Sequence, residues 1–391
     1  MSKEGGTGTD KTRLIHAGKG GDRHHGTVTT PVYHTSTVLF PSVAALKQAE
    51  NTSGGVTYGR YGTPTTFALQ DAIADLEGGG ACIVLPSGLS AITTALVGLL
   101  DSGDHLLMVD TVYNPTRRFC DSLLRTLGVQ TTYYAPDRDI RDLLRDNTRA
   151  VFLESPGSLT FEMQDIPAIA TAAREHGAVT LIDNTWATPL YCKPLSLGID
   201  VSIQSVTKYI GGHSDLMMGT VTADGDVFNR IHSTAFQLGL CAGSDDCFLA
   251  LRGLRTLVPR MERHGSTARI LAEWFSERPE VRRVLSPVLA HDPGHTIWNR
   301  DFTGSSGLFG VVLEPVNDTQ IAAMLDNLRY FGMGYSWGGF ESLILPVDPP
   351  RRTEVPWREA GPLLRIHAGL EDIDDLIGDL DAGLARLNRT A

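Results

Sequence analysis

The chain has 391 residues, too many for one simple core, so a large domain and a smaller one are expected. Its net charge of −11 argues against nucleic acid and anionic membranes as partners, although a few local donors can still bind an anion. The sequence has neither an apolar run of about 18 residues nor an apolar stretch near its start. We therefore expect a cytoplasmic protein that does not span a membrane.

The cysteines agree with that location. There are five, an odd number, and none forms a C-x-x-C pair. Reduced thiols are expected rather than a disulfide framework or a zinc site. We expect no metal site.

Short apolar strands alternate with helical stretches after a polar tail and arm at residues 1–60. The first helix is expected over 66–76 and ends at a run of three glycines. The strands and helices expected next are CIVLP, 88–100, HLLMVD, 115–127, VQTTYYA, RAVFLES, 167–176, AVTLID and VSIQSV. This rhythm is typical of a mostly parallel sheet covered by helices, which binds ligands beyond the carboxyl ends of its strands.

The rhythm changes after about residue 250. A long helix is expected over 249–277, followed by the strands GLFGVVLE, ESLILP and LLRIHAGL and an amphipathic helix over 371–388. This order predicts a separate α+β domain. The predicted division is a tail and arm at 1–60, a large domain at 61–250 and a C-terminal domain at 251–391.

Two polar residues follow predicted strands in places that suit chemistry. Lys208, in SVTKYIGGHSD, comes just after VSIQSV, where a desolvated amine has a lowered pKa and can form a Schiff base with an aldehyde. Asp183 ends the strand AVTLID, and a buried carboxylate there needs a cationic or donor partner. A structural lysine and a capping aspartate are the alternatives.

Two further loops suit a planar anion. Ser87 and Gly88 lie between a strand and a helix, where backbone N–H groups can bind an anion, although a simple serine N-cap explains them equally well. Tyr113 follows another strand, and its ring can stack on a planar cofactor or serve only in packing. Together, an anion cradle, an aromatic face, a carboxylate and an amine meet the needs of pyridoxal 5′-phosphate (PLP).

The motifs SVTKYIGGHSD, YGRYGTPT, DNTWATP and YSWGGFESLI, in this order, resemble the Cys/Met-metabolism PLP enzymes of fold type I. The resemblance runs from about residue 12 to the C-terminus. Within the family, ESPGSLT, RDFTGSSGLF and LLRIHAGLEDIDDL are most similar to the bacterial cystathionine β-lyases. The implied fold is α/β: an aspartate-aminotransferase-like large domain with a mostly parallel sheet and a smaller α+β C-terminal domain.

The resemblance also implies roles for individual residues. Lys208 matches the Schiff-base lysine, Asp183 the partner of the pyridine nitrogen, and Tyr113 the tyrosine stacked on the ring. Arg365 matches the arginine that binds the substrate α-carboxylate, with Ser336 and Trp337 nearby. The implied phosphate ligands are Gly88, Leu89, Ser205 and Thr207 from the same chain, and Tyr58 and Arg60 from a neighbouring subunit.

The implied activity is α,β-elimination of L-cystathionine to homocysteine, pyruvate and ammonia, a carbon–sulfur lyase reaction of methionine biosynthesis. The implied assembly is a homotetramer of dimers with shared sites.

Three positions bear on the choice between β- and γ-chemistry. Ser158 and Trp337 stand where γ-acting relatives commonly carry asparagine and leucine, which favours a β-lyase. Asn114 stands where well-known β-lyases look acidic, which leaves the substrate side chain open. A γ-lyase or γ-synthase is therefore the main alternative, and a non-catalytic PLP-binding protein is the remote one.

Overall fold

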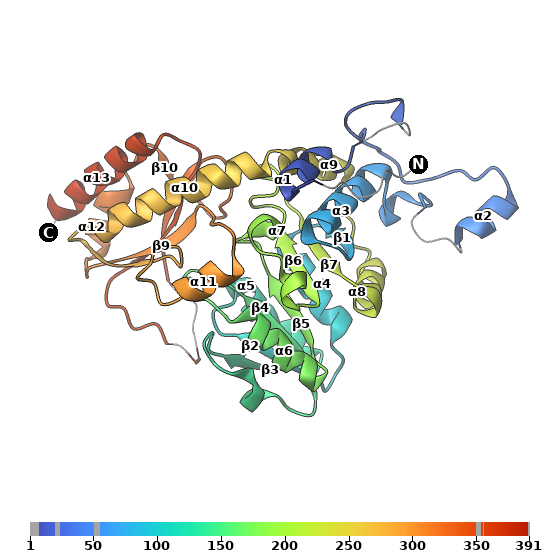
Figure 1. Cartoon of the computed structure of the whole chain (residues 1–391), viewed down its shortest axis with the longest axis horizontal. Helices are drawn as coiled ribbons and strands as arrows, with labels where there is room; N and C mark the ends of the chain where they lie inside the picture. Colours follow the sequence, from blue (N-terminus) through green and yellow to red (C-terminus); the bar gives the residue numbers. More distant parts are fainter. Residues whose placement is uncertain (1–7, 20–23, 51–54, 349–352, 355, 390–391) are drawn as a thin grey trace.

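Two β-sheets organise the chain in the computed structural model (Figure 1). The structure describes residues 8–19, 24–50, 55–348, 353–354 and 356–389. A seven-stranded sheet occupies the middle of the chain, and a five-stranded sheet is built from its C-terminal third. The long helix α10 (Leu257–Ser276) runs from one sheet toward the other.

The large sheet has the strand order β1-β7-β6-β5-β4-β2-β3. Its strands are β1 (Ala81–Leu85), β2 (His105–Val109), β3 (Gln130–Tyr134), β4 (Thr148–Glu154), β5 (Val179–Asp183), β6 (Val201–Ser205) and β7 (Gly219–Ala223). Only β7 runs against its neighbours β1 and β6; the remaining neighbouring pairs are parallel. The predicted fold class, an α/β large domain built on a mostly parallel sheet, is confirmed.

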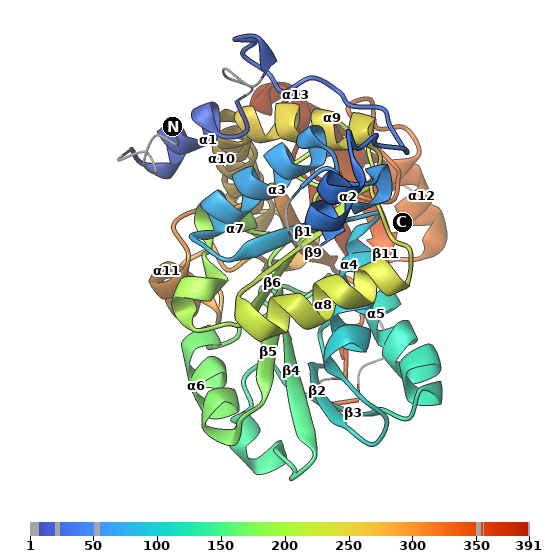
Figure 2. The same cartoon turned by 90° about the vertical axis from the view of Figure 1, so that its right-hand side faces the viewer.

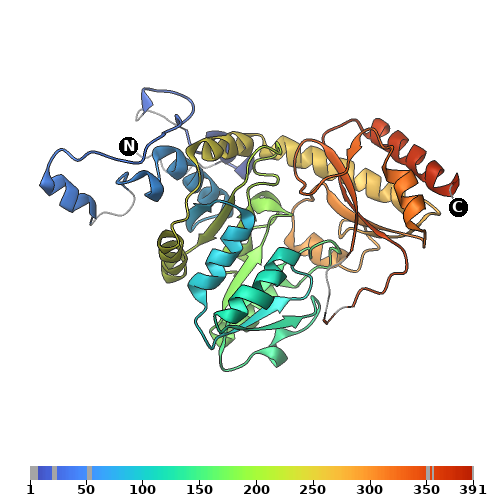
Figure 3. The same ribbon diagram turned by 180° about the vertical axis from the view of Figure 1, so that it is seen from behind.

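Helices cover both faces of this sheet. One face carries α3 (Pro64–Glu77), α6 (Ile166–His176) and α7 (Thr188–Tyr191), and the other, seen from behind in Figure 3, carries α4 (Gly88–Leu99), α5 (Asn114–Phe119) and α8 (Gly225–Gln237). Local signals fix several of their ends. The hydroxyl of Thr63 caps α3, and Gly78 ends it at φ 95°, a left-handed conformation that glycine adopts without strain.

The second sheet has the order β10-β11-β12-β9-β8 and is mainly antiparallel. Its strands are β8 (Val281–Leu285), β9 (Leu308–Leu313), β10 (Phe331–Gly332), β11 (Ser342–Val347) and β12 (Leu363–His367). Helix α10 packs on it together with α12 (Asp318–Leu325) and α13 (Ile373–Arg389). The separate α+β unit expected from the sequence is present.

The single helix expected over 249–277 is two helices, α9 (Ser244–Arg255) and α10, with a break at Thr256. The predicted domain boundary at residue 250 falls inside α9, and the division into three ranges stays a prediction.

The N-terminal arm extends away from the body of the molecule. Helix α1 (Asp10–His16) packs on α3 and α9, but α2 (Val43–Glu50) lies out to one side in Figures 1 and 3 and faces the viewer in Figure 2. Leu39 and Val43 on this arm are 88% and 70% exposed. Within the described residues no helix has the length and apolar character needed to cross a membrane.

Candidate active site

Six strands of the large sheet have their carboxyl ends at the same edge, and five of them lead into the candidate site. Strands β2, β4, β5 and β6 are parallel, and β1 points the same way because β7 runs against both β1 and β6. The side chains singled out in the sequence follow these strand ends. The sheet therefore gathers Gly88, Tyr113, Asp183, Ser205 and Lys208 along one edge.

Lys208 lies in the turn after β6. The pKa of its amine is lowered to about 8, mainly by burial and also by the positive charge of Arg365, while Asp183 acts in the opposite direction. Its Nζ donates to the hydroxyl of Ser336 at 2.5 Å and lies 5.2 Å from the centre of the Trp337 ring. An amine in this environment loses its proton more easily than a surface lysine.

Asp183 is held by the next turn of the chain. The backbone N–H and the hydroxyl of Thr185 both donate to its Oδ1, at 3.0 and 2.5 Å. Burial raises the pKa of Asp183, while the Thr185 bonds and the charge of Lys208 lower it. Such a fixed carboxylate suits a cationic ring nitrogen as its partner.

Tyr113 leads into α5 and is 44% exposed, so its ring is accessible. Its backbone N–H donates at 2.7 Å to Oε2 of Glu154, the last residue of β4. Burial raises the pKa of the Tyr113 phenol, and the charges of Asp183 and Glu154 raise it further, whereas Arg365 lowers it. These four groups therefore share one electrostatic environment.

The sequence reading missed Glu154. It is the second-last residue of the predicted strand RAVFLES and the last of β4, as Asp183 is the last of β5, and the two residues are register partners. Burial raises the pKa of Glu154 well above its ordinary value, and the charge of Asp183 adds to this effect. A carboxylate at the end of a buried strand was the signal that could have identified it.

The start of α4 forms the predicted anion cradle. Ser87 and Ser90 make a capping box, and Gly88 is the first helical residue. A Cβ added to Gly88 would lie 2.6 Å from the side chain of Ser205, so the two loops touch. Ser205 in turn donates its N–H to Thr185 Oγ1 at 2.8 Å, which joins the cradle to the Asp183 turn.

Two other predicted phosphate ligands are arranged differently. Leu89 is the second residue of α4 and is 36% exposed. The hydroxyl of Thr207 donates to the carbonyl of Met218 at 3.1 Å and accepts from its N–H at 3.0 Å. That hydroxyl faces the turn before β7, so phosphate donation by Thr207 would require it to rotate.

Arg365 reaches the site from the middle of β12 and is 9% exposed. Its Nη2 donates to the carbonyls of Gly334 and Ser336 at 3.2 and 2.8 Å. Burial lowers its pKa, and Tyr113 and Tyr335 oppose this shift. A buried guanidinium held by two carbonyls is well placed to bind an incoming carboxylate.

Tyr58 and Arg60 lie away from this cluster in the single chain. Arg60 donates to the carbonyl of Phe236 at 3.1 Å and lies 4.5 Å from the centre of the Tyr61 ring, while Tyr58 is 43% exposed. Their role in a neighbouring subunit's site stays a prediction. Asn114 begins α5, and Ser158 donates its N–H to the carbonyl of Thr111 at 2.8 Å.

The residues present fit PLP. The amine of Lys208 has a lowered pKa, Asp183 is fixed by Thr185, and the N-terminus of α4 touches Ser205. These supply a Schiff-base lysine, a partner for the pyridine nitrogen and a phosphate cradle.

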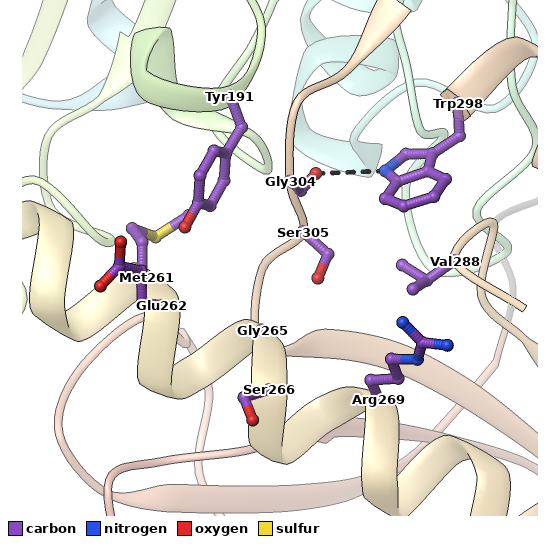
Figure 4. Close-up of a pocket in the computed structure, with 10 residues that line it drawn as sticks. All are labelled: Tyr191, Met261, Glu262, Gly265, Ser266, Arg269, Val288, Trp298, Gly304 and Ser305. Carbon is purple, nitrogen blue, oxygen red and sulfur yellow. Dashed lines mark hydrogen bonds between the residues drawn. The ribbon is translucent and has the colours of Figure 1, made fainter. Parts of the chain in front are cut away.

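A hollow of about 400 Å³ lies beside α10 and is lined by residues outside the predicted set (Figure 4). Its two charged side chains, Glu262 and Arg269, pair with Lys11 and Glu273. The indole N–H of Trp298 donates to the carbonyl of Gly304 at 3.1 Å. These groups already have partners, and the hollow has no set of ionisable side chains like the one around Lys208 and Asp183.

Comparisons with known proteins agree with the geometry. The family model described as "Cys/Met metabolism PLP-dependent enzyme" matches residues 11–385. The chain is 44% identical over 387 residues to a cystathionine β-lyase of Escherichia coli, covering 96% of this chain and 98% of that one. It is 41% identical over 392 residues to an L-alanine/L-glutamate racemase of Wolbachia pipientis, covering 97% of each.

A solved structure has a similar fold. The cystathionine γ-synthase of Xanthomonas oryzae pv. oryzae, in complex with aminoacrylate and cysteine, has a TM-score of 0.91 and 32% identity to this chain. The match covers 99% of this chain and 100% of that one.

Proposed function

The chain belongs to the family of Cys/Met metabolism PLP-dependent enzymes, and within it we propose a carbon–sulfur lyase that cleaves L-cystathionine by α,β-elimination. With water, one cystathionine gives homocysteine, pyruvate and ammonia. The observation that carries the proposal is the convergence of Lys208, Asp183, Tyr113 and Arg365 at one sheet edge, where their ionisable groups shift one another's pKa. The relative from Escherichia coli is itself a cystathionine β-lyase.

Each side chain has a distinct task in this proposal. Bound PLP supplies a ring that accepts the electrons left at Cα. Asp183 keeps the proton on the ring nitrogen, and Arg365 holds the substrate α-carboxylate with its guanidinium fork. Lys208 anchors the cofactor, and its amine removes the Cα proton once it is free.

The leaving group needs a proton donor. Homocysteine leaves from Cβ as a thiolate, and the ammonium of Lys208 or the phenol of Tyr113 can protonate it. The raised pKa of Tyr113 keeps its proton in place at neutral pH, as a general acid requires.

γ-Chemistry is the alternative within the family. The likeness to a cystathionine γ-synthase structure at 32% identity supports it, and the same lysine can remove the second proton that this route needs. Ser158 and Trp337 argue against it, because γ-acting relatives commonly carry asparagine and leucine there; the centre of the Trp337 ring lies 5.2 Å from Lys208 Nζ.

Racemisation of a small amino acid is a second candidate. The relative from Wolbachia pipientis, which is an L-alanine/L-glutamate racemase, favours it. Proton removal from Cα by Lys208 is common to both reactions. They differ in whether a group leaves Cβ or a proton returns to the other face of Cα.

One assay separates the three candidates. Purified protein loaded with PLP is given L-cystathionine, and pyruvate and 2-oxobutyrate are quantified; L-alanine is given separately, and D-alanine is quantified. Pyruvate as the main product supports β-elimination. A main product of 2-oxobutyrate, or faster formation of D-alanine than of pyruvate, would overturn the proposal in favour of that alternative.

The cofactor lysine is tested by chemistry at one atom. Borohydride reduction of the loaded protein should fix the cofactor on the peptide that contains Lys208. Lys208→Ala should lose both the label and the activity. Lys11→Ala, which removes an exposed ion pair with Glu262, should keep both. A label on another lysine would contradict the assignment.

We also propose a homotetramer built from dimers, in which Tyr58 and Arg60 complete the phosphate site of a neighbouring chain. The exposed apolar residues of the arm support this, because Leu39 and Val43 have little of the chain to pack against. A cytoplasmic location is proposed from the unpaired cysteines, four of which are buried.

A further inference from the structure

The loop of residues 334–339, called here the site loop, carries groups that meet Lys208 and Arg365. Ser336 Oγ accepts from Lys208 Nζ at 2.5 Å, and two carbonyls of the loop accept from Arg365. Gly338 packs directly on the lysine: a Cβ built on it would lie 2.9 Å from the carbonyl carbon of Lys208 and 3.0 Å from its Cα. A small shift of this loop would therefore move groups at the reacting lysine.

The site loop needs support from outside itself. Ser336 has φ +78° and Gly338 has φ +88°. A left-handed conformation is costly for a serine, and it persists only where surrounding contacts enforce it.

His367 provides one such contact through both ring nitrogens. Its Nδ1 lies 3.1 Å from the carbonyl oxygen of Glu341, which can only accept, so Nδ1 carries the proton. The N–H of Gly338 donates to its Nε2 at 3.1 Å, so Nε2 carries none. The two partners together fix a single neutral tautomer.

The surroundings of His367 maintain this state. The side chain is fully buried beside Tyr209 and His264, with ring centroids 5.7 and 5.2 Å away. Burial lowers the pKa of His367 well below its ordinary value, and the neighbouring His264, Arg365 and Lys208 add to this effect. A protonated ring would turn a second N–H toward the N–H of Gly338 and break the contact.

We propose that His367 is a positioning residue that fixes the site loop over Lys208 and Arg365 by accepting the Gly338 N–H. Because His367 lies two residues after Arg365 on β12, the two side chains share a face of the sheet. The kinetic part of this inference rests on the proposed function, whereas the hydrogen bond itself can be tested without it.

Two substitutions separate the two bonds of the ring. His367→Gln places an amide oxygen near the position of Nε2, so the acceptor for Gly338 is kept and the donor to Glu341 is lost. His367→Asn places an amide N–H near the position of Nδ1, so the donor is kept and the acceptor is lost. His264→Asn is the matched control, because it also replaces a buried ring of the same cluster and can keep the Nδ1 donor to Ala368.

The first measurement is hydrogen exchange of the peptide that contains Gly338, in protein with and without PLP. We expect exchange to accelerate by roughly tenfold in His367→Asn, in line with the loss of one hydrogen bond, and to stay near wild type in His367→Gln and His264→Asn. Equal acceleration in His367→Gln and His367→Asn, or none in His367→Asn, would overturn the proposal.

The second measurement concerns substrate binding. The KM for cystathionine and the inhibition constant of glycine, which has an α-carboxylate and no leaving group, should rise by roughly tenfold in His367→Asn. The kcat should fall less, and His367→Gln should restore both constants. Restoration by His367→Gln supports positioning, whereas equal loss in the two variants contradicts it. If wild type lacks lyase activity, the exchange result still decides the structural claim.

A third measurement does not depend on any variant folding. The ¹⁵N chemical shifts of His367 in wild-type protein should show a protonated Nδ1 and an unprotonated Nε2. The opposite tautomer, or a doubly protonated ring at neutral pH, would overturn the proposal.

Discussion

Two carboxyl groups end neighbouring strands at the active site, and their surroundings push them toward different states. Burial raises the pKa of both groups, but Asp183 receives two hydrogen bonds from Thr185 and lies near the charge of Lys208, which oppose the shift and favour its ionised form. Glu154 receives one backbone N–H and is repelled by Asp183. We infer that Asp183 is the anion of the pair and that Glu154 holds a proton.

This difference predicts opposite responses to amide substitution. Asp183→Asn should lower kcat by on the order of 100-fold or more, because an amide cannot hold the pyridinium proton. Glu154→Gln should stay within about tenfold of wild type, because an amide resembles the protonated acid and still accepts from Tyr113. Steady-state kinetics and cofactor absorption on both variants provide the check. A larger loss in Glu154→Gln than in Asp183→Asn would show that the roles are reversed.

Arg365 predicts a loss specific to the substrate carboxylate. Arg365→Ala strands that carboxylate in a buried site, which typically costs about 3–5 kcal/mol, so kcat/KM should fall by roughly 10²–10⁴-fold. Arg365→Lys keeps the charge and loses the planar fork, so its kcat/KM should lie between that of wild type and that of Arg365→Ala. Cofactor absorption should be unchanged in both variants. An unchanged kcat/KM in Arg365→Ala would mean that the carboxylate is bound elsewhere.

At the scale of elements, the sequence predicted strands β1 to β6 of the large sheet. CIVLP, HLLMVD and AVTLID are largely apolar runs, as buried parallel strands usually are, whereas VQTTYYA and VSIQSV are strands despite several polar residues. The pattern missed β7, since Gly219–Ala223 reads as glycine, threonine and alanine around one valine. Its place in the sheet comes from pairing with β1 and β6, which are distant in sequence.

The site divides in the same way. Residues at strand ends, such as Lys208 and Asp183, could be predicted because the strand and its end are both visible in the sequence. The contact of Gly338 with Lys208 and the bond of His367 to Gly338 join segments about 130 and 29 residues apart. No local pattern encodes these distances, so they required the three-dimensional structure.

The C-terminal end of α3 carries a buried acid that links stability to pH. Glu77 is fully buried, and its Oε1 accepts from Ser202 and Gln204 at 2.8 and 3.3 Å. Burial raises its pKa from 4.5 to about 7, although these hydrogen bonds and Lys193 oppose the shift. Between these two values the folded protein keeps a proton that the unfolded chain has released. Stability from this group is therefore present below about pH 4.5 and is lost as the pH rises through 7.

Glu77→Gln should remove that dependence, because the amide has no proton to lose at these pH values. One pKa unit corresponds to about 1.36 kcal/mol, so the variant should gain up to about 3 kcal/mol over wild type at pH 8. Little gain is expected at pH 5. Thermal and urea unfolding at both pH values measure the difference, with Glu262→Gln as a surface control. An equal gain at pH 5 and pH 8 would contradict the buried-acid explanation.

At the scale of the whole molecule, the arm is the part that the single chain does not explain. It leaves the body of the structure (Figures 1 and 3), exposes Leu39 and Val43, and leads to Tyr58 and Arg60. A two-fold dimer makes each chain both donor and recipient of such an arm. If Arg60 completes the neighbour's phosphate site, a Lys208 substitution damages the site of its own chain and an Arg60 substitution damages the site of the partner. Each substitution still inactivates both sites of its homodimer.

Mixing two inactive proteins tests this arrangement. In a heterodimer of Lys208→Ala with Arg60→Ala, one site carries both lesions, while the other combines an intact Lys208 with an intact Arg60 from its partner. Activity should therefore return, up to about half of the sites in each heterodimer. Lys208→Ala mixed with Asp183→Asn is the control, because both residues act within their own chain and every site keeps one lesion. Heterodimers are verified by two affinity tags; if they regain no activity, Arg60 serves its own chain. Activity in the control mixture would come from contaminating wild-type protein rather than from shared sites.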